Sequence, residues 1–110
     1  MIMSTLLSAK KLFLTDQQLT EFCQRWSIIE LAIFGSILRQ DFSPDSDIDI
    51  LITFDPQVKR SLFDLIHLKD ELEQRLGRNV DVLTKKSVEQ SHNWLRKRNI
   101  LNTAQVIYDS

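Results

Sequence analysis

Three short stretches of the chain carry the residue pattern of β-strands. Residues 28–34, IIELAIF, form an apolar run that ends directly at Gly35 and is typical of a buried strand. Residues 47–54, DIDILITF, alternate, so that isoleucines face one side while Asp47 and Asp49 face the other. Residues 79–84, NVDVLT, alternate in the same way around Asp81. The pattern therefore predicts three strands, two of which carry aspartates.

Two segments between these strands have the periodicity and end signals of helices. In residues 15–26, Thr15 and Gln18 are spaced as a capping box ahead of an inward-facing apolar side. In residues 61–76, Ser61 and Asp64 are spaced in the same way and Gly77 follows the last turn. The apolar stripe predicted for this second helix is Leu62, Leu65, Ile66, Leu68, Leu72 and Leu76.

The end of the chain is less clear, because residues 87–108 are mostly helical in pattern whereas residues 104–108, AQVIY, suit either a helix or a short edge strand. The order of elements predicts an α/β (α+β) fold, a small mixed β-sheet with helices packed on one face. At 110 residues, we expect positions 1–110 to form a single domain.

Composition places the chain among ordinary globular proteins, with a formal net charge of −1 and a single cysteine. We expect a cytoplasmic protein with no membrane segment, because no run approaches the ~20 apolar residues of a span. The balanced charge argues against direct nucleic-acid binding. The charges are nevertheless segregated. Residues 39–57 hold the acids Asp41, Asp45, Asp47, Asp49 and Asp55, and residues 85–98 hold the bases Lys85, Lys86, Arg96, Lys97 and Arg98. The basic run next to Trp94 fits a solvated helix face, or a contact with a polyanion or a partner.

Asp47 and Asp49 are placed as ligands of a hard cation. Strand rise puts their Cα atoms roughly 6.5–7 Å apart on one side of the strand. Mg²⁺ is usually held by one or two carboxylates together with substrate phosphates, and paired ions catalyse phosphoryl displacement. If strands 47–54 and 79–84 are neighbours, Asp81 can share a metal or accept a proton. The simpler alternative is a set of polar, solvated strand ends.

Gly35 and Ser36 could form a phosphate-facing turn. A glycine after a buried strand lets the backbone approach a ligand closely, and N–H groups at a helix start favour phosphate. The Ser36 hydroxyl can donate to a phosphate oxygen, and Arg39 can supply positive charge. The alternatives are a plain turn glycine, an N-cap serine and a surface ion pair between Arg39 and Asp41 or Asp45.

The stretch GSILRQDFSPDSDIDILITF, followed by NVDVLT, resembles the DNA polymerase β-like nucleotidyltransferase superfamily, above all its minimal members, over residues 28–84. The resemblance implies that Gly35 and Ser36, with Arg39 nearby, bind the nucleoside triphosphate. It also implies that Asp47 and Asp49 hold two Mg²⁺ ions, and that Asp81 is the third acidic residue and base. Leu38 and Gln40 depart from the small residues that larger members often have there.

The same resemblance implies a function, the transfer of AMP from ATP to a hydroxyl of a partner protein. Minimal members typically pair with a HEPN-domain RNase toxin and act as its antitoxin. A chain this short has no room for an acceptor-binding domain, so another chain must bring the acceptor. Two alternatives remain open, a non-catalytic antitoxin that neutralises by complex formation and an RNA-modifying or nucleotide-binding subunit. The sequence also leaves open a homo-oligomer, the acceptor residue and the nucleotide preferred.

Overall fold

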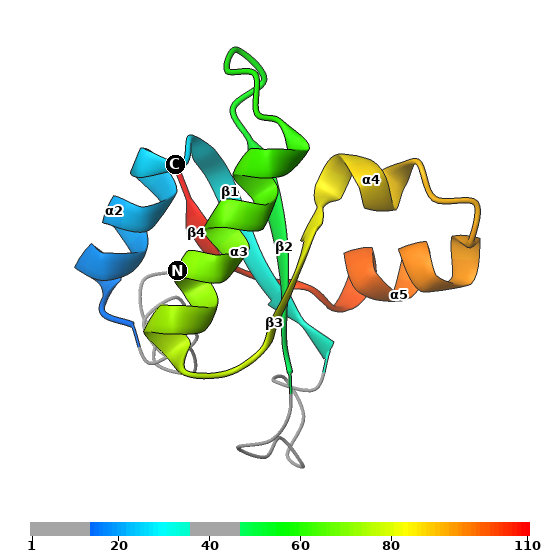
Figure 1. Cartoon of the computed structure of the whole chain (residues 1–110). Helices are drawn as coiled ribbons and strands as arrows, with labels where there is room; N and C mark the ends of the chain where they lie inside the picture. The colour runs from blue at the N-terminus through cyan, green and yellow to red at the C-terminus, as the bar shows by residue number, and fades with distance from the viewer. Residues whose placement is uncertain (1–13, 36–46) are drawn as a thin grey trace.

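The computed structural model describes residues 14–35 and 47–110, and a four-stranded sheet forms its centre (Figure 1). The strands are β1 (Ile28–Phe34), β2 (Ile48–Phe54), β3 (Val80–Thr84) and β4 (Gln105–Asp109), in the order β3-β2-β1-β4. β1 is antiparallel to both β2 and β4, whereas β2 and β3 are parallel. The expected mixed sheet is therefore confirmed, and the ambiguous residues near the C-terminus form an edge strand.

Helices cover both faces of the sheet. The helices are α2 (Asp16–Arg25), α3 (Leu62–Leu76), α4 (Lys85–Glu89) and α5 (Trp94–Thr103). α2 packs on β1 and α3 on β3, and α4 contacts β2 and β3 (Figure 1). The larger core lies under α2 and α3, and a smaller one lies under α4 and α5 around Ala32, Phe34, Leu51, Val88 and Ile100.

The expectation that helices pack on one face was therefore wrong, although the fold class was right. Alternation along a strand gives each face its own side chains, and β1 is apolar on both. Leu31 and Ile33 belong to the larger core, while Ala32 and Phe34 belong to the smaller one. A strand that is apolar on both sides needs cover on both sides, and α4 and α5 provide the second layer.

Both long helices begin at the capping boxes that the sequence predicts. The Thr15 side chain accepts from the backbone N–H of Gln18, whose side chain accepts in turn from the backbone of Thr15. Ser61 and Asp64 make the same reciprocal pair at the start of α3. At the other end of α3, Gly77 has φ +68° and its N–H donates to Glu73 O, which closes the helix.

The apolar stripe of α3 is only partly buried. Leu68 and Leu72 are fully buried in the larger core, and Leu65 and Leu76 pack against it. Leu62 and Ile66 were expected in the stripe but are 70% and 47% exposed. Leu62 and Ile66 are four positions apart and share one flank of α3, beside the side that carries Leu65, Leu68 and Leu72 to the core, so they meet solvent.

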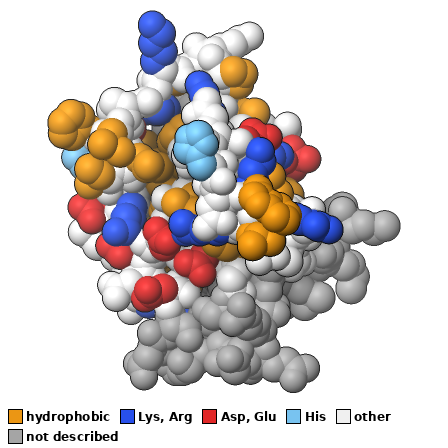
Figure 2. Space-filling model, turned by 90° about the vertical axis from the view of Figure 1, so that its right-hand side faces the viewer, with side chains coloured by type: hydrophobic (Ala, Val, Ile, Leu, Met, Phe, Trp, Pro, Cys, Tyr) orange, Lys and Arg blue, Asp and Glu red, His pale blue; other side chains and the backbone are white. Residues whose placement is uncertain are grey.

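Exposed hydrophobic side chains also occur at the start of α5, where Trp94 and Leu95 are 63% and 59% exposed. Figure 2 shows that apolar side chains gather in separate places on this side of the molecule, with basic side chains among them. Within the described part of the chain, no helix is long and apolar enough to cross a membrane.

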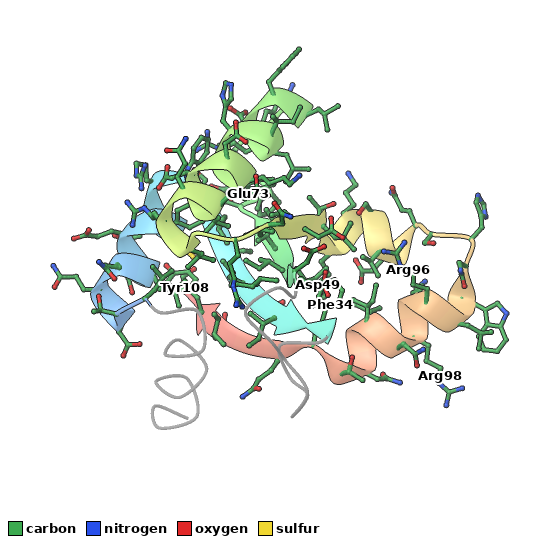
Figure 3. The ribbon with its side chains drawn as sticks, turned by 60° about the horizontal axis from the view of Figure 1, so that its bottom comes forward. Phe34, Asp49, Glu73, Arg96, Arg98 and Tyr108 are labelled. Carbon is green, nitrogen blue, oxygen red and sulfur yellow. The ribbon has the colours of Figure 1, made fainter. Side chains whose placement is uncertain are left out.

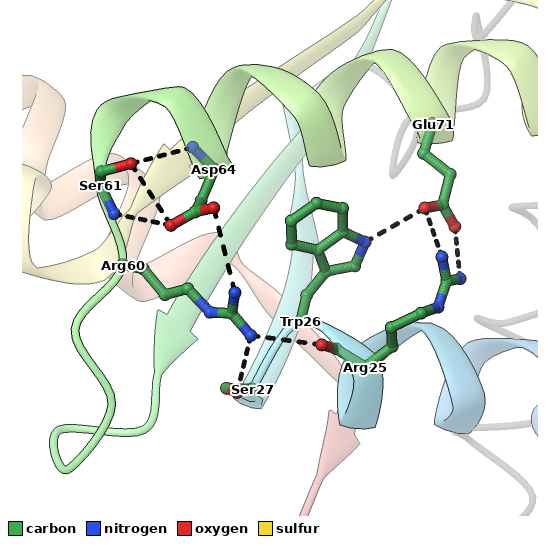
Figure 4. Close-up of polar contacts among 7 residues, drawn as sticks. All are labelled: Arg25, Trp26, Ser27, Arg60, Ser61, Asp64 and Glu71. Carbon is green, nitrogen blue, oxygen red and sulfur yellow. Dashed lines mark hydrogen bonds and ion pairs between the residues drawn. The ribbon is translucent and has the colours of Figure 1, made fainter.

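A polar cluster fastens the end of α2 to the middle of α3 (Figure 4). The Arg25 guanidinium donates to both carboxylate oxygens of Glu71, at 2.7 and 2.6 Å, and Trp26 Nε1 donates to the same carboxylate at 3.2 Å. Arg75 lies 3.2 Å from it on the other side. Arg60 lies over the Trp26 ring, 5.6 Å from its centre. Within this cluster, Trp26 and Glu71 are 45 residues apart in sequence.

Replacing Glu71 with Gln is expected to lower the free energy of unfolding by about 1 kcal/mol at pH 7, since the pair with Arg25 is half-exposed and screened by solvent. Burial by itself would raise the pKa of Glu71, but hydrogen bonds and charge from Arg25, Trp26 and Arg75 outweigh it and lower the pKa. A carboxyl with a lowered pKa in the folded state adds stability at neutral pH and loses it as pH falls. Urea unfolding from pH 7 to pH 3 should therefore show the difference between wild type and variant shrinking with acidity. A difference that is constant across this range would contradict the assignment.

Candidate active site

The candidate site is a row of side chains across three neighbouring strands. Asp49 of β2 is paired with Phe34 of β1 on one side and with Asp81 of β3 on the other. Paired residues on adjacent strands point to the same face, and adjacent strands lie roughly 4.7–4.9 Å apart. The two carboxylates therefore stand side by side, although 32 positions separate them in sequence. Figure 3 shows Asp49 beside Phe34, where β1 ends.

The pairing of Asp49 with Asp81 depends on where β3 begins. The backbone N–H of Ile48 donates to Asn79 O at 3.0 Å, which starts the parallel ladder. Glu73 lies on the last turns of α3 (Figure 3). Its carboxylate accepts from the N–H of Val80 at 3.0 Å. A slip of one residue would turn Asp81 to the opposite face of the sheet. The link from α3 to β3 thus helps to keep both aspartates on one face.

Gly35 is fitted against the Asp49 carboxylate. Its φ of +77° lies in the left-handed region that favours glycine, and a Cβ there would clash with Asp49 Oδ2. Any other residue would have to displace the carboxylate. The turn after β1 and the carboxylate of β2 are therefore packed together without a side chain between them.

The site concentrates negative charge. Burial raises the pKa of Asp49, and the neighbouring charges of Asp81 and Asp47 raise it further, while the charge of Arg96 opposes them. Asp47, directly before β2, and Asp81 are both exposed, whereas Asp49 is partly buried. A half-buried carboxylate beside two others is an environment that a cation would stabilise.

The donor set suits Mg²⁺, which takes oxygen ligands and usually binds one or two carboxylates together with phosphates and water. Asp49 and Asp81 supply two such carboxylates on one face. In the ranges 14–35 and 47–110, no group of three or more His, Cys, Asp or Glu side chains is arranged to hold a metal ion. The aspartates thus do not form a complete cage, and substrate phosphates would have to supply further ligands.

The structure places the predicted site residues unequally. Gly35, Asp49 and Asp81 come together, and Asp47 is near enough for its charge to act on Asp49. Ser36 and Arg39, expected at the phosphates, lie outside the described residues, as does the helix expected from Ser36. Sequence reasoning missed Arg96 as a site residue. The basic run was visible, but nothing local showed which of its side chains faces the carboxylates.

Comparison with known proteins identifies the family. The sequence profile of the nucleotidyltransferase domain family matches residues 15–107, so the chain belongs to this family. It is therefore a nucleotidyltransferase by class, as the motif resemblance implied.

Two related proteins have names that specify an activity within this family. A Methanocaldococcus jannaschii protein, provisionally named protein adenylyltransferase MJ0435, is 49% identical over 73 residues, which cover 66% of this chain and 72% of the relative. The protein adenylyltransferase MntA of Thermococcus cleftensis is 38% identical over 68 residues, covering 62% of this chain and 67% of the relative.

Solved structures share the fold. One, provisionally described as a minimal nucleotidyltransferase, superposes with a TM-score of 0.64 at 28% identity and covers 90% of both chains. Another is a complex of an AMPylated Shewanella oneidensis HEPN toxin with its MNT antitoxin. It superposes with a TM-score of 0.58 at 14% identity, covering 86% of this chain and 69% of the other. At that identity the second likeness concerns the fold alone.

Proposed function

We propose that this protein transfers AMP from ATP to a hydroxyl group of a partner protein. The observation that carries the proposal is the register of β2 and β3, which places the Asp49 and Asp81 carboxylates side by side next to the Gly35 turn. Relatives named as protein adenylyltransferases support AMP as the group and protein as the acceptor.

In the proposed reaction, an acceptor hydroxyl oxygen attacks the α-phosphorus of ATP. The bond between the α- and β-phosphates breaks, and pyrophosphate leaves. Asp47 and Asp49, with Asp81, would hold Mg²⁺, which neutralises phosphate charge and orients the phosphates for in-line displacement.

Residues of this chain are assigned to proton transfer and to phosphate binding. Asp81 is exposed at the β3 edge of the sheet, where an incoming acceptor could reach it, and we assign it as the base that takes the hydroxyl proton. Gly35 lets the backbone come close to the phosphates because it carries no side chain. Ser36 and Arg39 are proposed as further phosphate contacts on sequence grounds.

A HEPN-domain RNase toxin is the proposed partner, which makes this chain its antitoxin. The fold occurs in complexes of a HEPN toxin with an MNT antitoxin, which supports this choice. The described residues form one four-stranded sheet with its helices, and we propose that another chain supplies the acceptor. A separate acceptor protein is consistent with that architecture.

The proposal can be tested by intact-mass spectrometry of the partner encoded beside this gene. The partner would be incubated with the full chain, Mg²⁺ and each nucleoside triphosphate in turn. We expect a mass gain of one or more AMP units with ATP, and none when EDTA replaces Mg²⁺. A stable complex without any mass gain would instead favour an antitoxin that acts by binding alone. No complex and no gain would refute both interpretations.

A further inference from the structure

A pocket of about 90 Å³ lies between α4 and α5, on the same side of the sheet as the candidate active site. Its apolar wall consists of Leu83, Val88 and Ile100, and Ser87, Ser91 and Arg96 contribute polar groups. Lys97 is also at the rim, where its ammonium donates to Glu89 O and joins the end of α4 to α5. Neither the motif nor the proposed chemistry uses this pocket.

The pocket adjoins the carboxylates through β3. Asp81 and Leu83 are two positions apart on one strand, so they share a face with their Cα atoms roughly 6.5–7 Å apart. On the face of the sheet that carries Asp49 and Asp81, the next pair along β2 and β3 is Leu51 and Leu83. Both leucines pack into the core under α4 and α5. A ligand whose phosphates reach the carboxylates could therefore place its other end over Leu83.

Arg96 connects the two places. It lines the pocket, and its charge acts on Asp49. Figure 3 shows Arg96 pointing between α4 and α5, whereas Arg98, one half-turn further along, points away from the opposite side of α5. Positive charge at the junction of pocket and carboxylates suits a ligand that is anionic at that point.

Two hydroxyls of the pocket offer one hydrogen-bond acceptor and one donor. The Ser87 hydroxyl donates to Thr84 O at 2.9 Å, so its lone pairs remain free to accept. The Ser91 hydroxyl accepts from the N–H of Asn93 at 3.2 Å, so its hydrogen is free to donate. Adenine presents an amino donor next to a ring-nitrogen acceptor, whereas the same edge of guanine presents two acceptors.

We propose that the pocket between α4 and α5 binds the adenine base of the nucleoside triphosphate, with Arg96 at the junction of base and phosphates. The pocket volume of about 90 Å³ suits the base alone, with the phosphates bound outside it, because it is far below the ~300–1,000 Å³ of sites that enclose drug-sized ligands. It suits one ring system with an edge in solvent. The inference rests on the proposed function for its ligand, and it adds where the base is bound and why ATP is preferred.

Calorimetric titration of the full chain with ATP and with inorganic tripolyphosphate, both in Mg²⁺, tests the pocket directly. Ser91→Leu should fill the pocket and weaken ATP binding by about tenfold, since it removes a hydrogen bond and space for the ring. Tripolyphosphate has no base, so its affinity should stay unchanged. Equal losses for both ligands, or no loss for ATP, would overturn the proposal.

Arg96 and Arg98 offer a matched pair of variants. Arg96→Ala should weaken ATP binding, and Arg98→Ala should leave it within about twofold of the wild type, because Arg98 points away from the pocket. GTP should bind the wild-type chain more weakly than ATP does. Equal effects of the two arginine variants, or GTP binding as tightly as ATP, would count against the adenine assignment.

Amide spectra of the wild-type chain provide a measurement that needs no variant. Signals of Ser91, Lys97 and Ile100 should shift with ATP and stay in place with tripolyphosphate. ATP binding that leaves these signals unmoved would refute the pocket, even if AMP transfer to the partner is observed. Conversely, shifts at the pocket without any AMP transfer would refute the proposed function and leave the inference standing.

Discussion

Replacing Asp49 with Asn is expected to lower the rate of AMP transfer by about 10³-fold or more, while the protein stays folded. The variant removes one of the charges proposed to hold the metal, and metal-assisted stabilisation of such a reaction is worth several kcal/mol. The side chain keeps its size, so the packing against Gly35 can remain. Single-turnover mass spectrometry of the partner measures this rate.

Asp109→Asn is the matched control, because Asp109 is an exposed carboxylate on β4, paired with Glu30 at the opposite end of β1 from Phe34. Its rate should equal that of the wild type. If Asp49→Asn retains a rate within about tenfold of the wild type, a loss of little more than 1 kcal/mol, the assignment of Asp49 to the metal and phosphates is wrong.

The same Asp49→Asn variant should be more stable than the wild type at pH 7 without divalent ions. Burial, then Asp81 and Asp47, raise the pKa of Asp49, so ionising it is less favourable in the folded state than in the unfolded state. The folded state then loses stability as pH rises from the ordinary pKa of this group through the raised one. Asn carries no charge and escapes this loss. Melting curves should show a higher Tm for the variant at pH 7, and an advantage that fades as pH falls below the ordinary pKa. A lower Tm at pH 7 would contradict the like-charge interpretation of the site.

Gly35→Ala is expected to reduce AMP transfer by about 100-fold and to destabilise the fold. The left-handed φ of +77° costs an alanine about 1–2 kcal/mol, and the new methyl group would clash with Asp49 Oδ2. Asp49 must then move, and a displacement of about 1 Å in a catalytic group can cost about 10²-fold in rate. Chemical denaturation and the partner-modification assay measure the two effects.

Gly77→Ala is the control that introduces backbone strain without a steric clash. Gly77 has a similar φ of +68°, but no atom lies within 4 Å of the position that its Cβ would take. We expect it to lose about 1–2 kcal/mol of stability and to keep the wild-type rate. Should both glycine variants lose activity in proportion to stability, the contact between Gly35 and Asp49 would have no specific role.

Most of the local structure could be predicted from the residue pattern. Helix capping depends on hydrogen bonds between residues a few positions apart, so a short stretch of sequence contains both the donor and the acceptor. This holds for the capping boxes at Thr15 and Ser61 and for the helix end at Gly77. Alternation in residues 47–54 likewise sufficed to set Asp47 and Asp49 apart from the buried isoleucines. The spacing of Gly35-Ser36, Asp47, Asp49 and Asp81 along the chain was also enough to indicate the nucleotidyltransferase family.

Other features depend on contacts between segments that are distant in sequence, so the residue pattern could not predict them. Residues 105–109 became a strand because the free edge of β1 was available to pair with them, whereas their pattern alone also suits a helix. Leu62 and Ile66 stayed exposed because they lie on a flank of α3, and helical periodicity does not report how far around the helix the core reaches. The packing of α4 and α5 on the second face of the sheet was likewise not predicted from the sequence.

In the candidate site, too, some features follow from local sequence and others from contacts between distant segments. Parallel pairing brought Asp81, 32 positions away in the chain, beside Asp49. Helix packing brought Arg96, 47 positions away, close enough for its charge to act on Asp49. Local sequence specifies which way a side chain points, but long-range burial and strand pairing decide what it faces.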